Sequence, residues 1–314
     1  MVARPDAVLG AAATTTRRAW MAWIALALAG CKTAPVAPPP PSEPAPPEPP
    51  PKPVPRPPRI GLALGGGAAR GFAHIGVLQV LDEAGVRPAL VAGTSAGSLV
   101  ATLFASGKSG AELARLAEAM DEASIADWSF PGRGLLRGEA LARFVREHTG
   151  GRRIEQMALP LGIVATDLDN GQPILFQVGD PGVAVRASSA VPAVFQPVRI
   201  GSREYVDGGL VSPVPVRFAR QMGAEFVIAV DISEQPDGAA TGDMMRILLQ
   251  TFSIMGRSIS QFELQAADIV IRPRLAGVPA ADFSARRRSI QAGREAALAA
   301  LPEIRSRLAA ALKA

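Results

Sequence analysis

Two segments of the chain share one order: an apolar run, a glycine-containing turn and an amphipathic stretch. In the first, the apolar run 60–64 leads into three glycines, after which apolar residues recur at helical spacing over 72–81. In the second, the run 89–92 leads into the turn 93–97, and helical spacing returns over 99–104. Each pattern predicts a buried strand that turns sharply into a helix.

The same alternation continues toward the C-terminus. Continuous apolar runs, typical of strands buried on both faces, occupy 161–166, 226–232 and 269–271. Helical patterns occupy 110–121, 137–148, 215–222, 244–266 and 285–312. Strands that alternate with helices predict an α/β fold, a three-layer α/β/α sandwich with a mostly parallel central sheet. No internal repeat or second linker divides 59–314, so we expect one domain there.

The N-terminal segment has the composition of an export signal. Arg17 and Arg18 precede the apolar stretch 19–29, which is too short to span ~30 Å of hydrocarbon as a helix. This pattern predicts a cleaved signal peptide over 1–30. Its end, Leu-Ala-Gly-Cys, resembles a bacterial lipobox, so we expect Cys31, the only cysteine, to be lipidated. The alternative is an ordinary N-terminal helix with a chance cysteine.

A proline-rich segment follows Cys31. Residues 35–58 contain 15 of the 29 prolines, a composition that favours an extended polyproline conformation. We therefore expect 31–58 to be a tether between a lipid anchor and the folded domain 59–314; an interdomain linker is the alternative. The anchor would place the protein in the bacterial cell envelope. The residue after the cysteine is Lys32 rather than Asp. By analogy with enteric sorting rules, this favours the outer membrane.

Charge and composition exclude several classes of function. The chain is 48% hydrophobic and 19% charged, which excludes global disorder. Although the net charge is +5, no run interleaves basic with aromatic residues, so no nucleic-acid partner is predicted. One cysteine and two distant histidines form no cluster of zinc-type ligands, and no metal or organic cofactor is expected.

Ser95 is the first candidate for catalysis. It lies at the centre of a G-x-S-x-G motif between Gly93 and Gly97, where a buried strand is expected to turn into a helix. Glycines on both sides relieve crowding, and the helix N-terminus after the turn favours a developing anion. The context therefore predicts a nucleophile elbow; a tight structural turn is the alternative.

The glycine loop 65–71 is a candidate oxyanion hole. It presents backbone N–H groups at the start of another helix. A dinucleotide-binding or phosphate-binding loop is the alternative, but neither frame of the loop fits G-x-G-x-x-G and no Gly-Lys-Ser/Thr follows. Two strand-to-helix turns could therefore face one reacting carbonyl group.

The residues alone leave the catalytic base open. A serine triad needs an imidazole, and the chain offers only His74 and His148. We expect His74, one turn into a helix, to cap or pack, and His148, at a helix end, to be exposed. Asp207 ends a short strand before Gly208 and Gly209, and in a pocket its carboxylate could take the serine proton.

The ordered motifs together resemble the patatin-like phospholipase family, particularly its bacterial members. These are G-G-G-x-x-R-G at 65–71, G-T-S-A-G at 93–97 and D-G-G at 207–209, with further similar blocks at 71–78, 165–168 and 187–195. The similarity covers roughly 59–275. It implies a Ser-Asp dyad that hydrolyses lipid carboxylic esters through an acyl-enzyme.

The resemblance also assigns roles to single residues. It implies Ser95 as nucleophile, Asp207 as base, and the amides of Gly66, Gly67 and Ala68 as oxyanion donors. Arg70 and Gly71 complete the first motif, Gly93 and Gly97 the second, and Gly208 and Gly209 the third. The lipid ester is then the substrate, and a membrane is reached through the N-terminal anchor.

Ala68 departs from the family pattern, which has a third glycine there. Alanine keeps the N–H but resists a positive φ, so either φ is negative at this position or the loop is strained. Ser188 and Ser189 are alternative serines that lack the elbow setting and are expected to cap or pack. Two rival functions remain: a lipoprotein that binds lipid or an envelope protein without turnover, and an ordinary soluble esterase.

Overall fold

The computed structural model describes residues 56–121, 127, 133–233, 242, 244–279 and 282–312. Contacts group Pro53–Ala314 into one compact unit. The predicted signal peptide, Cys31 and all but the last three residues of the predicted tether lie outside the described residues, so the domain boundaries stay predictions.

Strands buried on both faces form the centre of this unit. Apolar runs place β1 (Ile60–Leu64), β2 (Leu90–Thr94), β4 (Leu161–Asp167), β9 (Phe226–Val230) and β10 (Ile269–Ile271) in parallel pairs. The eight-stranded sheet runs β10-β9-β1-β2-β4-β8-β7, with β5 also paired to β4. The pattern therefore puts β1 and β2, which carry the two glycine motifs, side by side in the middle of the sheet.

Antiparallel strands complete one edge of the sheet. These are β5 (Pro173–Phe176), β7 (Val198–Ile200) and β8 (Arg203–Asp207). A separate parallel pair joins β3 (Gly134–Leu136) and β6 (Ala193–Phe195). Because β8 runs antiparallel to β4, its last residue, Asp207, pairs with Ala165 inside the sheet.

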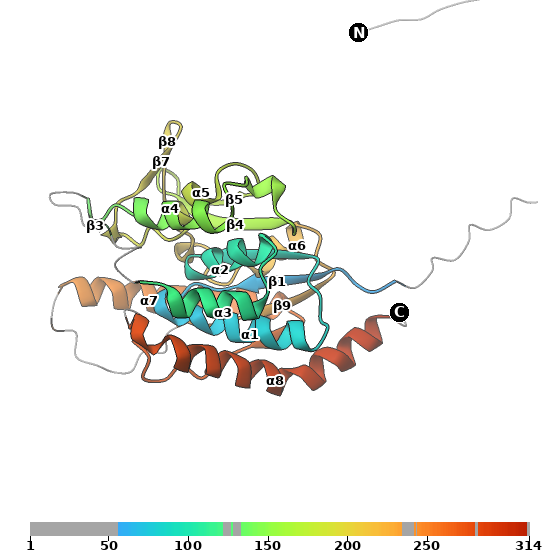
Figure 1. Cartoon of the computed structure of the whole chain (residues 1–314). Coiled ribbons are helices and arrows are strands. Elements are labelled where there is room, and N and C mark those ends of the chain that lie inside the picture. The colour runs from blue at the N-terminus through green and yellow to red at the C-terminus, as the bar shows by residue number, and fades with distance from the viewer. Residues whose placement is uncertain are drawn as a thin grey trace, which may run out of the picture. The chain divides into compact units, whose positions relative to one another are not determined.

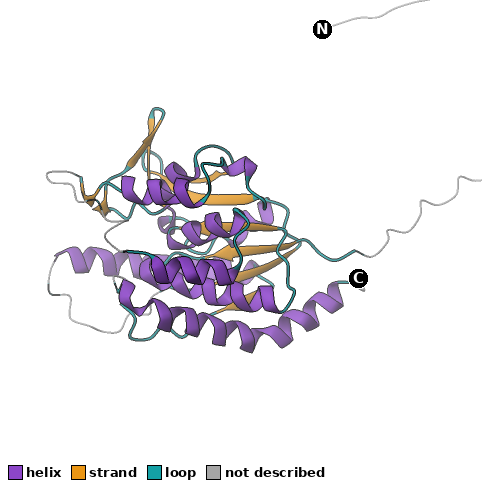
Figure 2. Ribbon diagram, in the orientation of Figure 1, coloured by secondary structure: helices purple, strands orange, loops and turns teal. Residues whose placement is uncertain are grey.

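Helices cover both faces of the sheet (Figures 1 and 2). Leu62 and Leu64 of β1 pack into the larger core cluster, whose helical members belong to α1 (Phe72–Glu83), α2 (Ala96–Ala105), α3 (Gly110–Ala119), α4 (Glu139–His148), α5 (Pro181–Ser188) and α8 (Arg286–Ala311). Ala63 points to the opposite face, where α6 (Val216–Gln221) contributes a second cluster. A further long helix, α7 (Met244–Glu263), precedes α8 in the chain.

The pairing of α1 with α8 depends on glycine at the contact. A Cβ on Gly76 would overlap the carbonyl oxygen of Ile290, and a Cβ on Gly293 would overlap that of Ala73. The two helix backbones therefore touch, and α8 closes the outside of α1, as Figure 1 shows.

The predicted three-layer α/β/α sandwich with a mostly parallel sheet is confirmed, and every predicted long element is present within a few residues. The pattern 244–266 divides into α7 and a single 3-10 turn, Leu264–Ala266. Helix α5 was not predicted, because eight residues show little periodicity; its signal is Asp180, whose side chain caps the helix, followed by Pro181 in the first turn. Within the described residues, no helix has the length and apolar character needed to cross a bilayer.

Candidate active site

The turn from β2 into α2 has the geometry of a nucleophile elbow. Ser95 lies between them at φ 52° and ψ −124°, a left-handed conformation that a non-glycine residue adopts at a cost of about 1–3 kcal/mol. A Cβ on Gly93 would overlap the Gly97 carbonyl, and a Cβ on Gly97 would overlap the Leu64 carbonyl. Both glycines are therefore required for the tight turn, as the sequence predicted.

The C-terminal end of α5 holds Ser95 and Asp207 in place. The Ser188 hydroxyl accepts the Ser95 N–H at 2.8 Å and donates to the Val164 carbonyl at 2.5 Å. Two residues later, the Ala190 carbonyl accepts the Asp207 N–H at 3.0 Å. Ser188 is fully buried and Ser189 ends the helix. Both alternative serines therefore support the structure, as expected.

Asp207 ends β8 with its side chain 6% exposed. Its Oδ1 accepts the Gly209 N–H at 2.6 Å, while Oδ2 has no hydrogen-bond partner of regular geometry in the described part of the chain. Burial raises the pKa of this carboxyl to about 6, opposed by the Ser95 side chain and by the Gly209 N–H. The carboxylate therefore interacts with the Ser95 side chain, and its Oδ2 can receive a proton.

Gly208 and Gly209, which follow Asp207, allow the chain to pass close to β4 and to the Asp207 carboxylate. A Cβ on Gly208 would overlap the Val164 carbonyl, and a Cβ on Gly209 would come within 2.9 Å of Asp207 Oδ1. The turn therefore lies directly against β4, and the expectation that these glycines permit a close approach is confirmed.

The glycine loop packs directly on the elbow. A methyl group on Gly66 would lie 3.2 Å from Ser95 Cβ. The Gly66 N–H, however, donates to the Pro213 carbonyl at 2.9 Å, so it is engaged within the protein. Among the described residues, the backbone hydrogen bonds outside helices and strands include none donated by the Gly67 or Ala68 amide. Of the three predicted oxyanion donors, Gly66 is therefore engaged, and the roles of Gly67 and Ala68 stay predictions.

Ala68 adopts the strained alternative of the two that the sequence left open. Its φ is 50°, the left-handed region, which costs an L-residue about 1–2 kcal/mol. The neighbouring motif residues fix the loop around it: buried Arg70 donates from Nε to the Gly67 carbonyl at 3.4 Å, and a Cβ on Gly71 would come within 2.8 Å of Ala96 Cβ.

Neither histidine hydrogen-bonds to Ser95. Fully buried His74 donates from Nε2 to the Gly65 carbonyl at 2.8 Å, and burial lowers its pKa to about 4, so it is neutral at pH 7. His74 therefore supports the glycine loop, in agreement with the expected packing role. His148 is half-buried against Phe144, with ring centroids 4.3 Å apart, which corrects the expectation that it is exposed.

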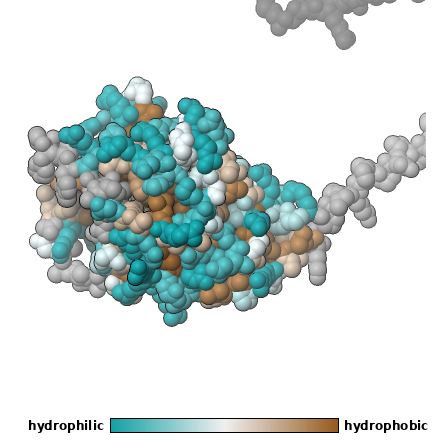
Figure 3. Space-filling model, viewed as in Figure 1, coloured by the Kyte–Doolittle hydropathy of each residue, from teal (hydrophilic) through white to brown (hydrophobic). Residues whose placement is uncertain are grey.

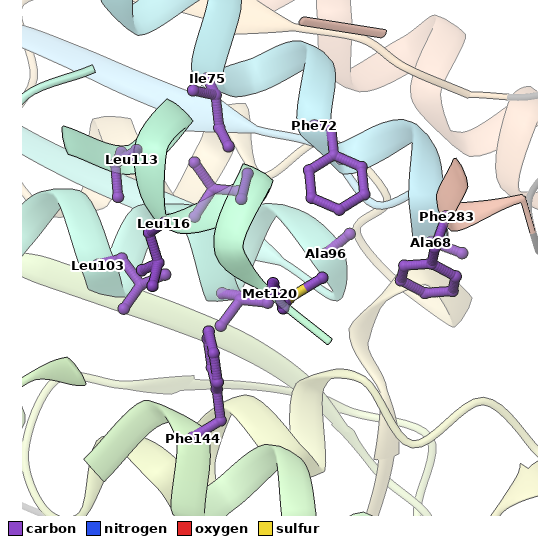
Figure 4. A pocket seen from close by; sticks show the side chains of 14 residues that line it. Ala68, Phe72, Ile75, Ala96, Leu103, Leu113, Leu116, Met120, Phe144 and Phe283 are labelled. Atoms are coloured by element: carbon purple, nitrogen blue, oxygen red, sulfur yellow. The ribbon is translucent and has the colours of Figure 1, made fainter. Parts of the chain in front are cut away.

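An apolar pocket of about 70 Å³ adjoins the loop and the elbow. Figure 4 shows Phe72 and Phe283 beside Ala68 at one end, and Leu103, Leu113 and Leu116 at the other. Every lining residue is apolar: Ala68, Gly71, Phe72, Ile75, Ala96, Leu99, Val100, Leu103, Leu113, Leu116, Ala117, Met120, Phe144 and Phe283. Because these residues come from distant segments, no local pattern in the sequence indicated the pocket.

The segment 212–214 connects β2, the glycine loop and α7 through hydrogen bonds. No pattern in the sequence indicated these connections. The Ser212 carbonyl accepts the Thr94 hydroxyl at 2.8 Å, and the Pro213 carbonyl accepts the Gly66 N–H. Glu263 of α7 accepts the Ser212 hydroxyl and, at 3.3 Å, the Val214 N–H. Burial raises the pKa of Glu263 to about 7.

No group of three or more metal-ligating side chains occurs within the described residues.

Comparison with solved structures supports the same fold. The chain is similar to VipD from Legionella pneumophila, with a TM-score of 0.56 and 14% sequence identity, over 79% of this chain and 67% of that one. At this identity the likeness concerns the fold alone.

Comparisons of sequence define the family. The family model described as patatin-like phospholipase matches residues 62–220. An uncharacterized NTE family protein of Mycobacterium tuberculosis is 37% identical over 67% of this chain and 59% of its own length. Patatin-like phospholipase domain-containing protein 6 of Mus musculus is 33% identical over 57% of this chain and 14% of its own. The chain therefore spans little more than half of the mycobacterial relative, and it belongs to the patatin-like phospholipase family.

Proposed function

We propose that this protein is a serine acyl hydrolase that cleaves carboxylic esters of lipids, with Ser95 as nucleophile and Asp207 as its base. The observation that carries the proposal is the buried Asp207 carboxylate, which interacts with the Ser95 side chain and whose Oδ2 has no hydrogen-bond partner of regular geometry among the described residues. The proposal places this dyad beside an entirely apolar pocket, which suits a lipid acyl chain.

The first half-reaction forms an acyl-enzyme. Asp207 Oδ2 takes the proton of the Ser95 hydroxyl as Oγ attacks the ester carbonyl carbon. The tetrahedral intermediate collapses with cleavage of the bond to the alkoxy oxygen, and the leaving alcohol takes the proton from Asp207. In the second half, water attacks the acyl-Ser95 ester and gives its proton to Asp207. Collapse then releases the carboxylic acid and returns the proton to Ser95.

The pKa of Asp207 suits this role. At about 6 it is well above that of an ordinary aspartate, so the carboxylate is a stronger base, yet most molecules are deprotonated at pH 7. No imidazole is needed for the proton transfer, which agrees with the placement of His74 and His148.

The proposed oxyanion hole consists of the Gly67 and Ala68 amides at the start of the helical turn 68–71. Among the described residues, no backbone hydrogen bond outside helices and strands is donated by either amide, so an oxyanion could accept from both. Each such donor contributes ~10²–10³ in rate when correctly placed.

The proposed acyl site is the apolar pocket. Its lining begins at Ala68 in the glycine loop and at Ala96, which directly follows Ser95. It continues toward Leu113 and Leu116 (Figure 4). An acyl carbonyl held over Ser95 would direct its hydrocarbon chain along this lining. We propose that the pocket receives the part of one acyl chain nearest the ester, and that the reaction is of the phospholipase or lysophospholipase type.

Steady-state hydrolysis of a nitrophenyl ester tests the proposal. Asp207→Asn should lower kcat by ~10²–10⁴, the contribution of general base catalysis, whereas His148→Ala should change it little. Loss of turnover in a folded His148→Ala protein, together with survival in Asp207→Asn, would overturn the dyad.

A second candidate function is lipid binding without turnover. The observation that favours it is the left-handed conformation of Ala68, which strains one of the two proposed oxyanion donors. If this candidate is right, a fluorescent fatty acid binds to the wild type, and neither the wild type nor Ala68→Gly hydrolyses esters of any acyl length.

We also propose that the protein is held at a bacterial membrane, with the outer membrane favoured, by a lipid on Cys31. This proposal rests on the lipobox-like sequence and on the proline-rich segment after it. Both lie outside the described residues, apart from 56–58.

A further inference from the structure

Helix α7 carries a row of exposed apolar side chains along one face. Met244 and Phe262, near its two ends, are 85% and 74% exposed. The other members are Ile247, Leu248, Ile254 and Met255, all exposed. Their spacing places all six on one face of the helix, where the polar residues Thr251 and Ser258 interrupt the row. We call these six residues the α7 stripe.

The charges on α7 are arranged beside the stripe. Arg246 and Arg257 are exposed, and the helix contains no Asp or Glu before Glu263 at its last position. The opposite face packs on the protein through half-buried Phe252 and Gly256 and through buried Ser260. An apolar face with basic residues along its flank and no exposed acid is the pattern of a helix that lies in a membrane interface.

Helix α7 lies next to the proposed active site, which it contacts through the face opposite the stripe. A Cβ on Gly256 would be 3.6 Å from Pro213 Cγ and 3.8 Å from the Gly209 carbonyl oxygen. Gly209 belongs to the turn that positions Asp207, and Pro213 accepts the Gly66 N–H of the glycine loop. In Figure 1, α7 lies at the left edge, beyond the end of the strands that carries the site.

Most of the surface has a different character. The face in Figure 3 is largely hydrophilic, with hydrophobic residues in separate patches. Among the described residues outside α7, the exposed large apolar residues are single ones, such as Val178 and Leu298. Six apolar side chains in one row therefore point to a binding surface.

We infer that the α7 stripe docks on a lipid surface and brings the Ser95 site to the membrane interface. The inference rests on the proposed lipid substrate, and it adds the element by which that substrate is reached. Exposed Arg257 and the lack of Asp or Glu between Met244 and Phe262 favour an anionic bilayer over a second copy of this chain, whose stripe would bring like charges together. On docking, the apolar side chains enter the acyl region and the arginines remain at the level of the headgroups.

Site-specific labelling tests the docking without any turnover. The full chain contains one cysteine, so Cys31→Ser permits a single new label and removes the proposed anchor. An environment-sensitive fluorophore is attached at Ile254→Cys or, as the matched control, at Leu298→Cys on α8, with 52% and 51% exposure of the native side chains. Both proteins also carry Ser95→Ala, so that no lipid is consumed.

With vesicles of phosphatidylglycerol and phosphatidylcholine, the label at 254 should show a several-fold emission increase and quenching by nitroxide lipids, and the label at 298 neither. Equal responses at both positions, or none at 254, would overturn the inference. A rise at 254 without vesicles that grows with protein concentration, together with a dimer in sedimentation, would assign the stripe to a second copy instead.

Measurements of activity provide an independent test of the docking. In protein with an intact Ser95, Ile254→Gln combined with Phe262→Gln should lower the ratio of vesicle hydrolysis to soluble-ester hydrolysis about tenfold, whereas Val178→Ser should leave the ratio unchanged. An unchanged ratio in the double variant contradicts the docking role. Absence of soluble-ester hydrolysis in the wild type contradicts the proposed function but leaves the labelling result to decide the docking.

Discussion

Asp207→Asn is expected to stabilise the protein at neutral and alkaline pH while it removes catalysis. The variant keeps an Oδ1 that can accept the Gly209 N–H, so the turn is preserved. It replaces the unpartnered Oδ2 with an amide group, which cannot take a proton from Ser95. A residue held for its chemistry at a cost in stability is expected at an active site.

The magnitude follows from the pKa. Burial raises the pKa of Asp207 from 3.8 to about 6, so the folded state binds more protons than the unfolded state between these values. Stability therefore falls as pH rises through this window, and the loss is complete above pH 6. A shift of this size corresponds to about 3 kcal/mol. Asparagine does not ionise, so the variant should gain up to that amount at pH 8 and little at pH 4.

The assay is urea unfolding of the wild type and Asp207→Asn at pH 4 and pH 8, followed by circular dichroism. The difference in unfolding free energy between the two proteins should increase in favour of the variant from pH 4 to pH 8. The reasoning is refuted if that difference is the same at both pH values, or if the variant is the less stable protein at pH 8.

Three further predictions concern the loop, its support and the anchor. Ala68→Gly should raise kcat, by at most the ~10²–10³ of one oxyanion donor, because glycine adopts φ 50° without strain; an unchanged or lower kcat for nitrophenyl ester hydrolysis would show that the alanine loop is already productive. His74→Ala should lower the unfolding free energy by about 3 kcal/mol in urea titrations, since it leaves a cavity and removes the hydrogen bond to Gly65; a loss near zero contradicts this support. Cys31→Ser should abolish incorporation of a palmitate analogue in cells, and equal labelling of the variant and wild type would exclude the lipid anchor.

The sequence predicted the central part of the fold because its strands are buried on both sides. Such strands appear as continuous apolar runs, and β1, β4, β9 and β10 each lie within a predicted run or extend it by one residue. The edge of the sheet and the separate β3-β6 pair were harder to predict, because β5, β6 and β7 are only three or four residues long and only partly buried.

The motifs predicted which residues meet but not which of their atoms remain free. Glycines at 93, 97 and 208 indicated close approach, and each would overlap a carbonyl oxygen if it carried a Cβ. The loss of the Gly66 amide to the Pro213 carbonyl depends on a contact between segments nearly 150 residues apart, so no local pattern could show it.

The apolar pocket and Glu263 were missed for the same reason. The pocket is lined from α1, α2, α3, α4 and the segments beside them, each of which reads as ordinary core in the sequence. Glu263 lies at the end of an amphipathic helix, where a charged residue is usually solvated; only the packing of α7 on Ser212 buries it.

Labelling with a fluorophosphonate probe tests the central claim, that Ser95 is an activated nucleophile with Asp207 as its base. Mass spectrometry of the labelled wild type should show one adduct, on Ser95, with a rate that rises with pH through about 6 as Asp207 deprotonates. Ser95→Ala should show none, and Asp207→Asn should react at least ~10²-fold more slowly. A wild-type protein that remains unlabelled, or an Asp207→Asn protein that reacts at the wild-type rate, would contradict the account.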